Sequence, residues 1–133
     1  MSIFEDTAPR AARHEPLRVA VLGASGSVGM QTLDVCRHFP QKLQVVALAV
    51  RSSAEFAVKA ANEFNCKYVA FADASVKGNV LLDALPQGCK ASFGPEAVQA
   101  LAELDEVDCV VNAVVGEAGI YAGLAAVKAG KVL

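Results

Sequence analysis

Three glycines at three-residue spacing form the clearest candidate ligand site in this sequence. They stand in the segment Gly23-Ala24-Ser25-Gly26-Ser27-Val28-Gly29, between an apolar run and a helical pattern. Gly23 permits a tight turn, Gly26 lets the backbone approach a ligand, and Gly29 lets a helix pack closely. Unpaired N–H groups at the start of a helix suit a pyrophosphate, and the serines add hydroxyl donors. The segment therefore predicts a phosphate-binding loop.

The spacing Gly-x-x-Gly-x-x-Gly differs from the commonest dinucleotide fingerprint, so a glycine-rich turn without a ligand is the alternative. A second group of candidates, Arg51, Ser52 and Ser53, follows the next apolar run. NAD-binding proteins usually carry an acidic residue there, bonded to the ribose 2′-hydroxyl. An acid would repel a 2′-phosphate, whereas Arg51 can form a forked contact and Ser52 and Ser53 can donate hydrogen bonds. These residues favour NADP(H) over NAD(H), with a solvated arginine and a plain helix cap as the alternative.

A third candidate segment runs from Asn112 to Gly119 and follows the strongest late apolar run. We expect this run on the far side of the switch point of the sheet, where the nicotinamide half of a dinucleotide lies. Small apolar residues such as Ala113 and Val114 suit a flat ring. The alternative is a core strand followed by an ordinary helix start.

The remaining titratable residues show no catalytic constellation. His14 stands near the N-terminus, and His38 ends the first helical pattern, where the helix dipole favours it. Asp105, Glu106 and Asp108 precede the late strand, and we expect a solvated loop there rather than a metal site. We therefore predict no catalytic and no metal-binding residue in this chain.

The composition excludes several classes of protein. The chain has 133 residues, 54% of them hydrophobic and 20% charged, which predicts one folded domain rather than a disordered chain. No apolar run reaches the roughly 20 residues of a membrane span, and a net charge of −2 without a basic block argues against nucleic-acid binding. The four cysteines are expected to be buried free thiols, namely Cys36, Cys66, Cys89 and Cys109. The expected location of the protein is the cytoplasm.

Strand-like and helix-like segments alternate along the chain and would position these candidates. Residues 1–16 are expected to be a flexible leader and residues 17–133 one domain. Strands are predicted over residues 17–22, 43–50, 68–71, 89–93 and 108–115, with another beginning at residue 131. Helices are predicted over residues 27–39, 52–64, 76–85 and 119–129, with one more opening at 94–96; Ser52 to Glu55 fits a capping box. This order predicts a doubly wound, Rossmann-like α/β fold, with helices on both faces of a parallel sheet.

From Leu17 onward the sequence resembles 1-deoxy-D-xylulose 5-phosphate reductoisomerase, the NADPH-dependent enzyme family of non-mevalonate isoprenoid synthesis. The resemblance rests on the glycine segment with its continuation Gln31-Thr32-Leu33-Asp34-Val35, on Asn112-Ala113-Val114-Val115-Gly116, and on the stretch from Leu124 to Lys131. By position it implies that the family's NADPH loop consists of Ser25, Gly26, Ser27 and Val28. The sequence departs from the family after the second strand, where the family typically has Ala-Gly-x-Asn.

The resemblance also implies what lies outside this sequence. The family isomerises 1-deoxy-D-xylulose 5-phosphate at a Mg²⁺ or Mn²⁺ centre and reduces the product with NADPH to 2-C-methyl-D-erythritol 4-phosphate. Its metal and substrate site and its C-terminal helical domain follow the strand that begins at Lys131, and the family is homodimeric. We therefore expect a truncated form that binds NADPH without turnover. The alternatives are another Gly-x-x-Gly-x-x-Gly dehydrogenase, such as aspartate-semialdehyde dehydrogenase, and a non-catalytic NADP-sensing Rossmann module.

Overall fold

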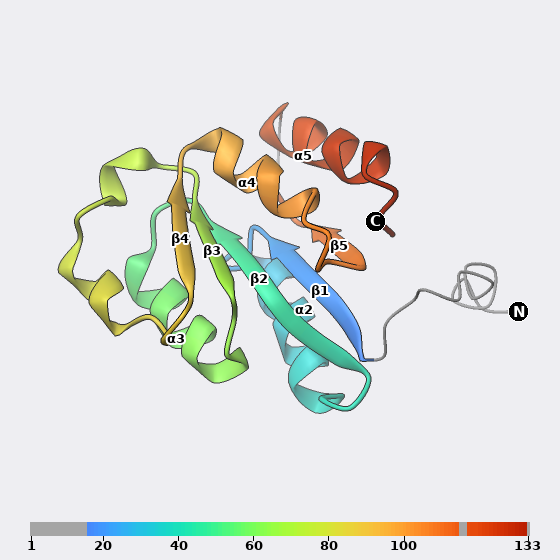
Figure 1. The fold of residues 1–133 in the computed structure, drawn as a ribbon, viewed down its shortest axis with the longest axis horizontal. Coiled ribbons are helices and arrows are strands. Elements are labelled where there is room, and N and C mark those ends of the chain that lie inside the picture. Colours follow the sequence, from blue (N-terminus) through green and yellow to red (C-terminus); the bar gives the residue numbers. More distant parts are fainter. Residues whose placement is uncertain (1–15, 115–116, 133) are drawn as a thin grey trace, which may run out of the picture.

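A parallel sheet of five strands, in the order β4-β3-β2-β1-β5, forms the centre of the structure (Figure 1). The structure is a computed structural model that describes residues 16–114 and 117–132. Its strands are β1 (Leu17–Leu22), β2 (Leu43–Val50), β3 (Tyr68–Phe71), β4 (Lys90–Phe93) and β5 (Cys109–Asn112). Its α-helices are α2 (Ser27–His38), α3 (Ala54–Phe64), α4 (Pro95–Ala102) and α5 (Glu117–Lys128).

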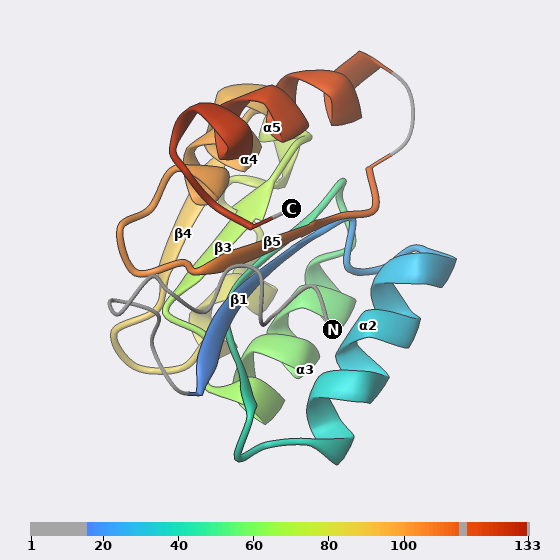
Figure 2. The same cartoon turned by 90° about the vertical axis from the view of Figure 1, so that its right-hand side faces the viewer.

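Helices cover both faces of this sheet, α2 and α3 on one side and α4 and α5 on the other (Figure 2). Because successive side chains of a strand point to opposite faces, β1 contributes to both cores. Val19 and Val21 pack with α2 and α3, whereas Ala20 and Leu22 pack with α4 and α5. The predicted doubly wound fold is confirmed. None of the helices described here is long and apolar enough to cross a bilayer.

The order in which the strands are added to the sheet reverses between β1 and β5. β2 pairs with one edge of β1 and β5 with the other, so that Leu22 lies opposite both Ala49 and Asn112. The carboxyl ends of three strands therefore meet at one place, which is where open α/β sheets bind their ligands. The predicted position of the late strand across this switch point is confirmed.

The helix predicted over residues 76–85 is wrong. Two short 3₁₀ helices, η1 (Ala74–Val76) and η2 (Val80–Ala84), stand in its place. Gly78 between them has a φ of +91°, which an α-helix cannot contain. The next residue, Asn79, accepts a hydrogen bond from the Leu81 N–H at 2.9 Å and starts η2. A glycine and an asparagine in succession thus interrupt an otherwise helical apolar spacing.

Smaller differences occur at the ends of elements. α3 begins after Ser53, whose hydroxyl oxygen accepts the Phe56 N–H at 3.4 Å, so the predicted capping box from Ser52 is also wrong. β5 ends at Asn112, and residue 115 of the predicted strand lies outside the described residues, as do residues 1–15 of the predicted leader. Val132 forms a parallel bridge with Cys109, which is consistent with a strand beginning at residue 131.

Candidate functional site

The turn after β1 is shaped by the carboxyl ends of its two neighbouring strands. The N–H groups of Gly23 and Ala24 both donate to the Ala49 carbonyl, at 3.0 and 2.9 Å. Gly23 has a φ of +78°, and a Cβ there would lie 2.9 Å from the carbonyl carbon and oxygen of Ala113. This position therefore needs glycine both for its backbone conformation and for its contact with the end of β5.

The other two glycines of the loop differ in what surrounds them. A Cβ on Gly29 would lie 2.1 Å from the Gly23 oxygen and 2.7 Å from the Ala24 Cα, so Gly29 lets α2 pack against the turn. A Cβ on Gly26 would meet only the Gly23 oxygen, at 3.4 Å, and its φ of −79° is open to any residue. The fold therefore requires glycine at 29 but not at 26. A bare backbone at 26 instead leaves room in the pocket beside it.

The start of α2 presents unused hydrogen-bond donors. Gly26 precedes the helix without a side-chain cap, and the first turn contains no acidic residue. In the described part of the chain, no acceptor is found for the backbone N–H groups of Ser27 and Val28. These donors and the positive end of the helix dipole suit an anion.

A pocket of about 490 Å³ lies in front of these donors, over the carboxyl ends of β1, β2 and β5. It brings together eight of the eleven residues predicted from the sequence: Gly23, Ser25, Gly26, Ser27, Val28, Arg51, Ala113 and Val114. The other three do not line it. Gly29 packs behind the loop, Ser53 caps α3, and Ser52 is exposed beside it.

Arg51 is the basic side chain at this pocket, and it is exposed. Its carbonyl accepts the Asp73 N–H at 2.8 Å, which ties the end of β2 to the end of β3. Hydrogen bonds from Ser75, and to a lesser extent the charge of Arg51, hold the pKa of Asp73 below its usual value. In the described residues no ion pair or hydrogen bond engages the Arg51 guanidinium, so it can meet a ligand anion.

Three further residues line the pocket that sequence reasoning missed, namely Ala49, Val50 and Val98. The first two directly precede Arg51, so the expected position of Arg51 at a strand end could have indicated them. Val98 comes from α4 and is buried, with 8% of its surface exposed. It reaches the pocket only because α4 crosses the sheet, and nothing in its local sequence indicates this.

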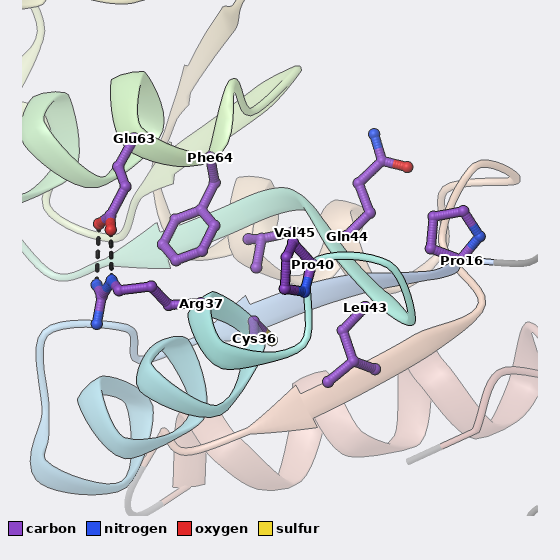
Figure 3. A pocket seen from close by; sticks show the side chains of 9 residues that line it. All are labelled: Pro16, Cys36, Arg37, Pro40, Leu43, Gln44, Val45, Glu63 and Phe64. Carbon is purple, nitrogen blue, oxygen red and sulfur yellow. Dashed lines mark hydrogen bonds and ion pairs between the residues drawn. The ribbon is translucent and has the colours of Figure 1, made fainter.

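A second pocket, of about 520 Å³, lies at the opposite end of β1 and β2. Figure 3 shows Arg37 from α2 facing Glu63 from α3 at one side of it. Arg37 Nη2 lies 2.9 Å from Glu63 Oε1, and this partner holds the pKa of Glu63 below its usual value. Its charged groups thus satisfy each other, and none of the predicted site residues lines it.

The acidic segment before β5 is only partly the expected solvated loop: Asp105 is exposed, whereas Glu106 and Asp108 are partly buried and paired. The Arg18 guanidinium donates two hydrogen bonds to Asp108, from Nε to Oδ2 at 3.0 Å and from Nη2 to Oδ1 at 3.1 Å. The hydrogen bond to Asp108 raises the pKa of Arg18 above its ordinary value. Tyr68 donates its hydroxyl proton to Glu106. These two carboxylates therefore tie the loop before β5 to β1 and β3, a tertiary role that the sequence did not reveal.

None of the four cysteines forms a disulfide, as predicted, but only two of them are buried. Cys36 and Cys66 are buried, whereas Cys89 and Cys109 are partly exposed. Burial raises the pKa of Cys66 to about 12. His38 lies in the last turn of α2, the dipole position expected for it. Within residues 16–114 and 117–132, no three His, Cys, Asp or Glu side chains are grouped to hold a metal ion.

Comparisons with known proteins match this arrangement. A family model described as 1-deoxy-D-xylulose 5-phosphate reductoisomerase matches residues 19–133. Proteins of that name from Photorhabdus laumondii and Cellvibrio japonicus are 40% and 38% identical to the chain, over 86% and 87% of its length. A solved structure of the Zymomonas mobilis reductoisomerase in complex with NADPH superimposes with a TM-score of 0.80 at 36% identity and covers 87% of the chain.

The chain matches only part of the length of each relative. The chain spans 29% of the Photorhabdus protein and 30% of both the Cellvibrio protein and the Zymomonas structure. The family model, in contrast, covers nearly all of the described residues. The chain belongs to the 1-deoxy-D-xylulose 5-phosphate reductoisomerase family.

Proposed function

We propose that the pocket over β1, β2 and β5 binds NADPH. The observation that carries this proposal is the glycine at position 26, which the fold does not require and which exposes the backbone to the pocket. The free N–H groups of Ser27 and Val28 would bind the diphosphate, with hydroxyl donors from Ser25 and Ser27. The NADPH complex of the Zymomonas relative supports the assignment.

The two halves of the cofactor would extend to either side of the diphosphate. We place the adenosine 2′-phosphate at Arg51, with Ser52 and Ser53 beside it. The Ser53 oxygen accepts the Phe56 N–H, so its own hydrogen is free to be donated to a phosphate. The nicotinamide half would lie toward Ala113 and Val114, across the switch point. NADPH would then bind more tightly than NADH, because Arg51 contacts only the cofactor with the extra phosphate.

The complete protein would, on this proposal, carry out the reaction of its family. When bound, NADPH supplies a hydride, and residues of this chain would bind the cofactor and orient its nicotinamide ring. The substrate 1-deoxy-D-xylulose 5-phosphate would be isomerised at a Mg²⁺ or Mn²⁺ centre and then reduced. Solved relatives contain magnesium, with and without fosmidomycin.

Residues 17–133 would form the NADPH domain, and we propose that the 133-residue chain alone binds the cofactor without turnover. The metal and substrate groups of the family are expected in the part of the relatives that this chain does not span. We further propose a cytoplasmic homodimer for the complete protein. Turnover of 1-deoxy-D-xylulose 5-phosphate by the isolated chain would contradict the proposal that it binds the cofactor without turnover.

Calorimetric titration of the chain with NADPH and with NADH tests the proposed site. Arg51→Ala should weaken NADPH about tenfold, as expected when one charge-assisted hydrogen bond is lost, and leave NADH unchanged. Lys59→Ala is the matched control, since it removes an equal charge from the exposed surface of α3 outside the pocket. Equal affinity for the two cofactors, or equal effects of the two variants, would refute the 2′-phosphate assignment.

A further inference from the structure

The side chain of Asn112 joins the end of β5 to the first turn of α5. Its Oδ1 accepts the Val114 N–H at 3.3 Å, and its Nδ2 donates to the Gly119 carbonyl at 2.6 Å. Asn112 is half-buried and is the last residue of β5. Both ends of the carboxamide are therefore engaged within the protein, which fixes its orientation, and Asn112 is not among the residues that line the pocket.

The backbone of Val114 lies between Gly23 and Gly119. A Cβ on Gly23 would stand 3.1 Å from the Val114 nitrogen, and a Cβ on Gly119 would stand 2.1 Å from the Val114 oxygen. Val114 is thus enclosed between the phosphate-loop turn and α5, and it lines the pocket. Its position depends on Asn112, because the sheet ladder ends one residue earlier, where the Ala113 N–H donates to the Leu22 carbonyl at 2.8 Å.

We propose that Asn112 is a positioning residue for the nicotinamide half of the cofactor. It acts through Val114, whose backbone it holds against Gly23, and it does not touch the cofactor itself. The inference rests on the proposed NADPH function and adds that only the nicotinamide half of the cofactor depends on Asn112. Loss of the carboxamide moves the wall at β5 but leaves Arg51 and the N–H groups of α2 in place, so only ligands that contain nicotinamide lose affinity.

The test compares two ligands on the unaltered chain and three variants. NADPH contains both halves, whereas adenosine 2′,5′-bisphosphate contains the adenosine half with its 2′-phosphate and lacks nicotinamide. Asn112→Ala removes both hydrogen bonds. Asn62→Ala is the matched control, because the Asn62 carboxamide also makes two hydrogen bonds to the backbone, donating to the Val58 carbonyl at 2.9 Å and the Ala84 carbonyl at 2.8 Å, and does not line the pocket.

We expect Asn112→Ala to weaken NADPH roughly three- to tenfold, the effect of about one net hydrogen bond, and to leave the bisphosphate unchanged. Asn62→Ala should change neither affinity. Asn112→Asp keeps the acceptor for the Val114 N–H but sets a carboxylate oxygen against the Gly119 carbonyl, so it should weaken NADPH at least as much as alanine. An equal loss for both ligands in Asn112→Ala, or no loss for NADPH, would overturn the inference.

A second measurement separates this inference from the proposed function. Hydrogen exchange of the Val114 amide without any ligand should become faster in Asn112→Ala and stay unchanged in Asn62→Ala. If the unaltered chain binds neither ligand, the proposed function fails, and the exchange of Val114 still decides whether Asn112 positions it. Unchanged exchange in Asn112→Ala would refute the positioning role whatever the chain binds.

Discussion

Alanine at Gly26 and alanine at Gly29 should separate cofactor binding from stability. The new methyl at 26 would have the Gly23 oxygen as its nearest neighbour, at 3.4 Å, in a backbone conformation that alanine adopts freely. The lower entropy of the unfolded chain would favour this variant, and the loss of a good N-cap residue would oppose it. The two effects should leave its unfolding free energy within about 1 kcal/mol of the unaltered chain.

The same methyl would point into the pocket and keep a phosphate from the N–H groups at the start of α2. One lost charge-assisted hydrogen bond corresponds to about 1.5–3 kcal/mol, or at least a tenfold weaker NADPH affinity. Gly29→Ala should instead destabilise the fold, because its Cβ would stand 2.1 Å from the Gly23 oxygen. Such overpacking against backbone costs about 3 kcal/mol of stability, which corresponds to roughly 10 °C in Tm.

Urea unfolding and calorimetric titration of both variants provide the assay. The account requires Gly26→Ala to fold normally and bind poorly, and Gly29→Ala to unfold at a clearly lower urea concentration. Unchanged NADPH affinity in Gly26→Ala would show that the phosphates do not approach this backbone. Unfolding of Gly26→Ala would show instead that the glycine serves the fold, and the observation that carries the proposed function would be lost.

Three other outcomes follow from the contacts. Asp108→Ala should lower the unfolding free energy by about 2 kcal/mol, measured in urea, because it leaves the partly buried Arg18 guanidinium unpaired. Glu63→Gln should lower the unfolding free energy by less than about 1 kcal/mol at pH 7, since the pair with Arg37 is exposed. Because this pair depresses the pKa of Glu63 in the folded chain, the difference should disappear in a pH series of unfolding curves as the pH falls below that pKa. Cys66, whose pKa burial raises to about 12, should resist iodoacetamide at pH 8 until the chain unfolds.

The sequence was most informative where one local pattern decides the structure. The nearly all-apolar run Leu43–Val50 forms a strand with the predicted bounds, because a strand covered by helices on both faces buries nearly all of its side chains. Gly23 was likewise assigned to a tight turn, which its positive φ confirms. The helix expected over residues 76–85 is wrong because Gly78 interrupts the apolar spacing with a left-handed backbone that ends a helical turn.

Tertiary contacts account for what the sequence could not predict. Asp108 looked like one of several loop carboxylates, and its partner Arg18 lies ninety positions away in the sequence. Val98 reaches the pocket through the crossing of α4 over the sheet. The role of Asn112 depends on a carbonyl in the next helix, whose position relative to β5 is set by packing and not by local propensity.

The central claim is that NADPH occupies the pocket over β1, β2 and β5. Titration of the isotope-labelled chain with NADPH, followed by NMR of its backbone amides, tests this claim most directly because the two pockets lie at opposite ends of the sheet. The account predicts the largest shifts from Gly23 to Gly29, with further shifts at Arg51 and Val114. Shifts centred instead on Cys36, Leu43 and Phe64 would contradict it.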